Sequence, residues 1–192
     1  HPDSPNAGVI RVGSIIVGLQ AADGRQIPLH GNLVMEEPDL LSHTDLNLFM
    51  KRQTELDQAL RSGGARFVLA SGDQVPVVAI DTPWHQLSGG FSIHTFYGLI
   101  ALMVAVGIWA FRPKSAATRL YALSGVATMV NTLTLAIYGD REFVLSGDVF
   151  AVVSAVNHLA TLMVNASLVS LFWVYPRPLA RFPVPALMIC IA

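Results

Sequence analysis

Two histidines lie inside long apolar segments of this 192-residue chain. His94 falls near the start of the segment 91–111, and His158 falls well inside the segment 149–175. Imidazoles from two different helices can ligate a haem iron or respond to pH near neutrality. One hypothesis is therefore a haem-binding or redox membrane subunit that uses this pair.

The surroundings of the two histidines favour a simpler role. Their expected depths differ by roughly 9 Å at ~1.5 Å of rise per residue, and no second histidine pair accompanies them in the apolar segments. The single cysteine, Cys190, supports neither a disulfide nor a metal site. We therefore predict no metal and no cofactor, and we expect the histidines to act through hydrogen bonds.

If each apolar segment is a helix, in which successive residues are rotated by about 100° around the axis, its polar side chains gather on one face. In the segments 149–175 and 120–138, several polar side chains fall within an arc of about 60° around the helix axis. The first segment places the small residues Gly98, Ala101 and Ala105 on the face of His94, where they are expected to let another helix approach closely. The predicted ligand-binding or signal-transmission seam consists of His94, Ser124, Thr128, Asn131, Ser154, His158, Thr161 and Asn165.

Polar groups in hydrocarbon must find partners, so the three faces are expected to turn inward and meet. The simpler interpretation is that hydrogen bonds of about 0.6 kcal/mol each hold the helices together. The functional interpretation is a switch, in which a signal changes helix packing through discrete hydrogen-bond arrangements. Asn157 falls one position off the stripe and is expected to face a different neighbour.

The chain carries no motif that indicates catalysis. The sequence contains no HExxH, no GxSxG and no Walker loop, and no carboxylate lies inside an apolar segment. We therefore predict no catalytic residue in this chain, and an enzymatic role stays open. The basic residues are few and close to the apolar segments, which argues against a nucleic-acid partner.

Composition divides the chain into two parts. Overall 53% of the residues are hydrophobic and 13% are charged, whereas a soluble domain usually carries about a quarter charged. Residues 1–90 hold six of the 12 Lys and Arg and ten of the 13 Asp and Glu, while residues 91–192 are nearly all apolar. The composition predicts a small polar domain followed by a bundle embedded in a lipid bilayer.

The expected membrane helices cover residues 91–111, 120–138, 149–175 and 184–192, the last of them truncated. The first covers about 30 Å, the thickness of the hydrocarbon core. Before them we expect a disordered or truncated segment at residues 1–8, a domain at 9–82 and a linker at 83–90. The sequence reads as a piece of a longer protein, cut at both ends.

Loop charges indicate the orientation of these helices. The three loops hold three, one and two Lys or Arg in turn, which are Arg112, Lys114, Arg119, Arg141, Arg177 and Arg181. Short loops rich in Lys and Arg stay cytoplasmic, so the first and third loops are expected inside. Residues 1–90 are then extracytoplasmic, and we expect a multi-pass protein of the bacterial inner membrane.

The outer domain shows the pattern of a small α+β fold. Strands are expected at residues 14–19 and 26–29, with a turn at Asp23-Gly24. The stretch DLNLFMKRQTELDQALRSGG predicts an amphipathic helix, capped by Asp45 or Asn47 and ended by Gly63-Gly64. A closing hairpin follows at residues 66–80, with its turn at residues 71–73. The expected order is strand, strand, helix, strand, strand.

The glycine-led first strand, the helix FMKRQTELDQAL and the closing hairpin resemble the later half of a PDZ-like domain. Placed before spans that end in FRPKS and LFWVYPRP, they resemble the input region of bacterial membrane sensors such as ComP-type quorum-sensing histidine kinases. The resemblance implies a small PDZ-like extracytoplasmic domain followed by an α-helical transmembrane bundle. A PDZ-like domain could capture a peptide by strand addition, or serve as a spacer without ligand.

The preferred hypothesis is the signal-sensing input module of a membrane receptor. A small molecule, a peptide or a membrane-borne signal would be detected and passed to a cytoplasmic output domain outside this sequence, and we expect a homodimer. Two alternatives stay open. One is the haem-binding or redox subunit, and the other is an accessory subunit of a transport or assembly complex.

Overall fold

The computed structural model describes residues 6, 8–11, 13–29, 42–79, 87–139 and 143–175. The chain divides into two units, residues 1–87 with 141–151 and residues 88–140 with 152–192. The predicted N-terminal segment 1–8 and linker 83–90 lie partly outside the described residues. The predicted fourth span 184–192 and the cations Arg141, Arg177 and Arg181 lie wholly outside them.

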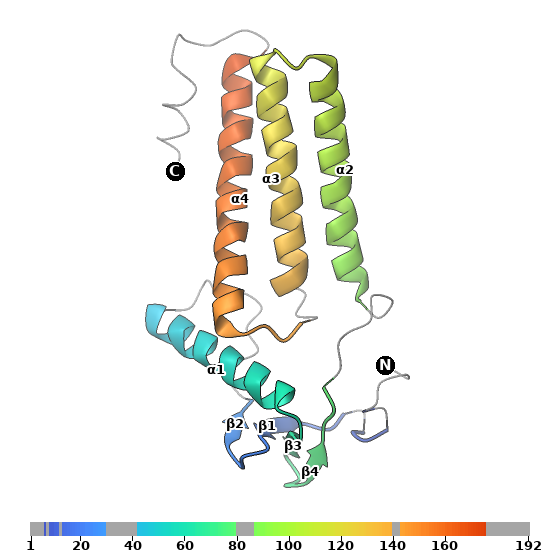
Figure 1. Ribbon diagram of the computed structural model, residues 1–192, viewed down its shortest axis with the longest axis vertical. Coiled ribbons are helices and arrows are strands. Elements are labelled where there is room, and N and C mark those ends of the chain that lie inside the picture. The colour runs from blue at the N-terminus through green and yellow to red at the C-terminus, as the bar shows by residue number, and fades with distance from the viewer. Residues whose placement is uncertain are drawn as a thin grey trace. The chain divides into compact units, whose positions relative to one another are not determined.

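The first unit contains a four-stranded antiparallel sheet in the order β2-β1-β3-β4 (Figure 1). The strands are β1 (Ile16–Gln20), β2 (Gln26–Pro28), β3 (Arg66–Leu69) and β4 (Gln74–Pro76). Helix α1 (His43–Arg61) lies between β2 and β3 in the sequence. The predicted order of elements and the mixed α+β layout are therefore confirmed.

Both hairpin turns form where the sequence predicts them. Gly24 and Gly72 have φ of 86° and 88°, a left-handed conformation that glycine adopts without steric cost. In the first turn the Asp23 carboxylate accepts from the backbone N–H of Arg25 at 2.9 Å and from its guanidinium at 3.1 and 3.2 Å. The backbone hydrogen bond from Arg25, followed by its side-chain bonds and charge, lowers the pKa of Asp23.

Helix α1 begins earlier than the sequence predicted. The cap is Ser42 rather than Asp45 or Asn47, and its hydroxyl accepts from the N–H of Asp45 at 3.2 Å. Asp45 instead lies in the first turn, where a negative charge favours the helix N-terminus. The helix ends at Arg61 with Ser62 as its C-cap, and the predicted Gly63-Gly64 stop follows directly, with φ angles of 72° and 71°.

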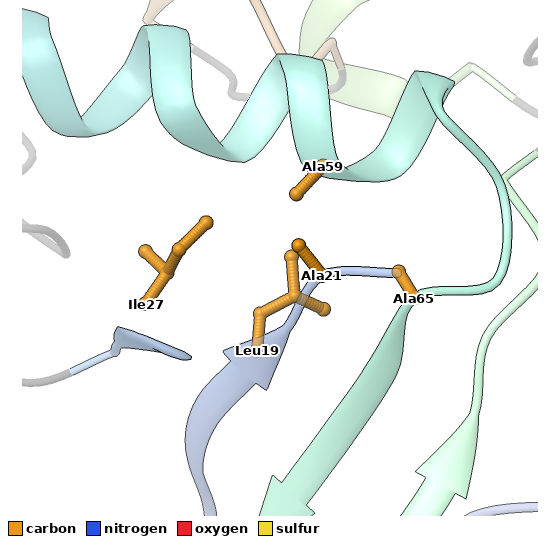
Figure 2. Close-up of a cluster of buried hydrophobic side chains, with 5 residues drawn as sticks. All are labelled: Leu19, Ala21, Ile27, Ala59 and Ala65. Atoms are coloured by element: carbon orange, nitrogen blue, oxygen red, sulfur yellow. The ribbon is translucent and has the colours of Figure 1, made fainter. Parts of the chain in front are cut away.

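The core of the first unit lies between α1 and the sheet (Figure 2). Leu19, Ala21 and Ile27 from the first hairpin meet Ala59 of α1, and Ala65 closes the end of the cluster. All five are at most 6% exposed. Because three of the five are alanines, the helix can lie close to the strands, and Leu56, Leu60, Leu29 and Phe67 pack around them.

The two edge strands of the sheet are short, and each carries a proline. The N–H groups of Leu29 and Val77 donate toward the neighbouring strands at 2.9 Å. Since backbone groups alternate along an antiparallel strand, Pro28 and Pro76 turn their nitrogens outward. Proline has no N–H, so neither edge offers a full ladder of donors to an added strand.

The second unit is built from membrane-length helices. Helices α2 (Gly89–Phe111), α3 (Ala116–Tyr138) and α4 (Gly147–Val174) are each long and apolar enough to cross a membrane. A short connection at residues 112–115 makes α2 and α3 antiparallel neighbours, and α3 lies between α2 and α4 (Figure 1). The three long apolar helices predicted within the described residues are confirmed as helices, with starts two to four residues earlier than predicted. The first turn of α4, residues 147–151, belongs to the first unit.

Candidate functional site

Helices α2 and α3 approach closely because glycines lie where they meet. A Cβ placed on Gly98 of α2 would overlap the Thr132 hydroxyl and lie 3.2 Å from the Cα of Met129. A Cβ placed on Gly125 of α3 would overlap the Cβ of Ala105. Gly98 and Ala105 are buried, which confirms the prediction that small residues on this face allow close helix approach.

Helix α3 meets α4 through polar side chains, with Asn157 of α4 at their centre. The Asn157 side-chain amide donates to the Asn131 carbonyl at 2.8 Å and to the Thr134 hydroxyl at 3.0 Å. Its Oδ1 accepts from the Tyr138 hydroxyl at 3.2 Å. Asn157 and Tyr138 are each 8% exposed. One buried amide therefore joins two long apolar helices through three hydrogen bonds.

A second amide extends this group of side chains. Asn131 Nδ2 donates to the Thr161 hydroxyl of α4 at 2.6 Å, and that hydroxyl donates to the Asn157 carbonyl at 3.0 Å. We call Asn131, Thr134, Tyr138, Asn157 and Thr161 the polar cluster. Its members are neutral amides and hydroxyls, so the chemistry it can perform is an exchange of hydrogen-bond partners.

The structure brings together only part of the predicted seam. Asn131 and Thr161 belong to the polar cluster, whereas Asn165 is exposed on α4. Ser154 is buried, and its backbone carbonyl lies 2.8 Å from Nδ1 of His158, whose side chain is exposed. A carbonyl can only accept, so Nδ1 carries the proton.

The other predicted seam residues lie on α2 and α3. Ser124 is buried, and its hydroxyl donates to the Tyr121 carbonyl at 2.8 Å. The Thr128 hydroxyl donates to the Ser124 carbonyl at 2.8 Å, so both of these hydrogen bonds stay within α3. His94 is half-buried on α2. Among the described residues, no group of three or more His, Cys, Asp or Glu could hold a metal ion.

Sequence reasoning missed the central role of Asn157 and Thr134. A signal was available in the run Phe150, Ser154, Asn157 and Thr161, which alternates spacings of four and three. That alternation is typical of a helix face that packs along a neighbour. Phe150, Ser154 and Asn157 are indeed buried, at 5%, 7% and 8% exposure.

The first turn of α4 packs against α1 within the first unit. The Thr54 hydroxyl of α1 accepts from the N–H of Gly147 at 2.9 Å. Gly147 is the first residue of α4, where backbone N–H groups lack partners within the helix. A residue 93 positions earlier in the sequence therefore caps α4.

Two further contacts fix α1 against this turn. The rings of Phe49 and Phe150 lie edge to face, with centroids 5.2 Å apart and an angle of 71° between them. Such pairs contribute about 0.5–1.5 kcal/mol beyond the area they bury. A Cβ on Gly147 would overlap the Met50 carbonyl, so only glycine allows this approach of α1.

Comparison with known proteins gives no family for this chain. No protein-family model, no curated protein and no solved structure matches it. The hydrogen bonds and packing of the described residues are therefore the basis on which a function can be argued.

Proposed function

We propose that this chain is the signal-sensing input module of a bacterial membrane receptor of the histidine-kinase kind. In this proposal residues 1–90 form a PDZ-like domain outside the cytoplasm, and the helices lie in the inner membrane. The domain or the bundle receives the signal, and the helices pass it to a cytoplasmic output domain. The chain contributes no catalytic residue of its own.

The observation that carries this proposal is that the two ends of one stretch of α4 make different contacts. Its first turn is capped by Thr54 and packed by Phe49 in the α+β unit, while Asn157, ten residues along the same helix, holds the polar cluster. A helix transmits a displacement along its axis because its backbone hydrogen bonds are continuous. A change in α1 can therefore reach the polar cluster through about three turns of α4.

The polar cluster supplies the second element that a receptor needs. Amides and hydroxyls have several alternative donor and acceptor pairings of similar energy. A small shift of α4 can thus replace one set of partners by another, which gives discrete packing states rather than a gradual deformation. This supports signal transmission as a role for the buried Asn157.

The edges of the sheet bear on the class of signal. With Pro28 and Pro76 turned outward, an added peptide strand would find one backbone N–H donor missing at each edge. The proposal therefore favours a small molecule or a membrane-borne signal over a peptide captured by strand addition.

A reporter fusion tests the proposal. Residues 1–192 are joined to the cytoplasmic part of a histidine kinase with a transcriptional reporter, and Thr54→Val is compared with Thr54→Ser. Valine removes the acceptor of the Gly147 N–H and keeps the size, whereas serine retains the hydroxyl. We expect Thr54→Val to change basal output at least about threefold and Thr54→Ser to leave it near wild type. Equal output from all three, at equal membrane levels, would argue for a passive anchor.

A further inference from the structure

Helix α4 carries a second asparagine, Asn165, which the proposed function does not use. Asn165 is exposed on α4, and within the part of the chain that the structure describes its amide makes no hydrogen bond. It lies about 7 Å from the midpoint of a helix long enough to cross the membrane. An amide at that depth has no water to bond, so it requires a partner from outside the described helices.

Asn165 belongs to an exposed row that runs along most of α4. Spacings of three and four alternate along Ala155, His158, Leu162, Asn165, Val169 and Phe172. All six are exposed. This is the heptad spacing by which two helices pack along their length, and it lies about 90° around α4 from the face that holds Asn157. We call it the α4 seam.

The chemistry of the row points to a second copy of the same helix. A primary amide both donates and accepts, so two copies of Asn165 related by a two-fold axis satisfy each other. A single asparagine in a heptad row fixes the register of two parallel helices. An identical α4 also matches the row in length, with Leu162 and Val169 packing on either side of the amide pair.

We infer that the α4 seam is the interface through which two copies of this chain associate in the membrane, with Asn165 paired across the two-fold axis. The inference stands apart from the proposed function, because it follows from the exposed face of α4 rather than from the contact between α1 and α4. Two other occupants are conceivable outcomes of a test. They are the apolar run from Val184 of the same chain, and lipid alone.

Disulfide cross-linking in native membranes separates these outcomes. The full chain is used with Cys190→Ser, and single cysteines are placed by Leu162→Cys on the seam or by Val156→Cys about 120° away on another exposed face. We expect the Leu162→Cys chain to form at least about five times more disulfide dimer than the Val156→Cys chain. No dimer, or equal dimer at both positions, would overturn the inference.

A second measurement addresses the amide itself. Donor- and acceptor-labelled copies are mixed in vesicles, and energy transfer gives their dissociation constant. We expect Asn165→Leu to raise that constant about 5- to 30-fold, the range for one interhelical amide pair in a membrane, and Asn165→Gln to recover part of the loss. An unchanged constant for Asn165→Leu would overturn the inference. So would a disulfide within one chain between cysteines placed at Leu162 and Leu187.

Discussion

The replacement Asn157→Leu tests whether the polar cluster holds α3 and α4 together. Leucine has the same number and branching of side-chain heavy atoms as asparagine but removes three hydrogen bonds, those to the Asn131 carbonyl, the Thr134 hydroxyl and the Tyr138 hydroxyl. At about 0.6 kcal/mol for each bond between membrane helices, the loss is about 2 kcal/mol. That corresponds to roughly a 30-fold fall in the folding equilibrium constant.

The matched control lies on the same helix. Asn165→Leu makes the same chemical change at an exposed position whose amide has no hydrogen bond within the described residues. In a dilute preparation where the chain is monomeric, we expect Asn165→Leu to alter the free energy of unfolding by less than about 0.5 kcal/mol. The difference between the two variants isolates the buried amide from the cost of placing leucine in α4.

Titration with SDS in mixed micelles, followed by tryptophan fluorescence, measures the free energy of unfolding. A double-mutant cycle with Tyr138→Phe then assigns the share of one bond, expected at about 0.6 kcal/mol of coupling. If Asn157→Leu cost no more than Asn165→Leu, the cluster would not hold the helices together. The assignment of the polar cluster as the link between α3 and α4 would then be wrong.

Three further outcomes can be checked separately. Gly125→Ala should destabilise the bundle by about 1–3 kcal/mol because its Cβ would overlap Ala105. Gly107 faces open space, so Gly107→Ala should be neutral or stabilising. Equal melting temperatures for the two variants would contradict this. Asp23→Asn should lower the thermal midpoint at pH 7 and make that midpoint fall less steeply between about pH 5 and pH 3. The reason is that a carboxyl with a lowered pKa stabilises the fold above its unfolded pKa and loses that contribution as pH falls. Parallel pH profiles for the wild type and the variant would contradict this. In a Cys190→Ser background, an impermeant thiol reagent applied to intact cells should label Ser71→Cys and spare Ser115→Cys, and the reverse pattern would overturn the proposed topology.

The length and apolarity of the three long helices made them predictable from sequence. A run such as 91–111 holds no formal charge and matches the hydrocarbon thickness, so few other structures can accommodate it. Both hairpin turns were also predictable, because Gly24 and Gly72 supply the positive φ that a turn needs. Ser42 was missed as a helix cap because polar residues are dense there, and only the backbone shows which of them lies outside the helix.

The polar cluster was predictable only in part, for a geometric reason. Helical periodicity gives the angles between residues of one helix but does not say which angle faces a neighbour. The predicted stripe from Ser154 to Asn165 therefore left out Asn157, which lies beside it on the helix and faces α3. The face of α4 that packs on α3 is fixed by the hydrogen bonds of the Asn157 side chain with Asn131, Thr134 and Tyr138 of α3. The cap from Thr54 to Gly147 joins residues 93 positions apart and left no local signal.

The most direct test of transmission along α4 is hydrogen–deuterium exchange in Gly147→Ala. Alanine has a higher helix propensity than glycine, so the change would not destabilise a helix that lacks the α1 contact. Here the added Cβ would overlap the Met50 carbonyl and displace α1 from α4. We predict faster exchange in α1 and also around residues 131–138 and 154–161. In the control variant Gly107→Ala, the exchange rates should match those of the wild type. Exchange that rose in α1 alone, or fell along α4, would contradict the proposal that α4 links the outer domain to the polar cluster.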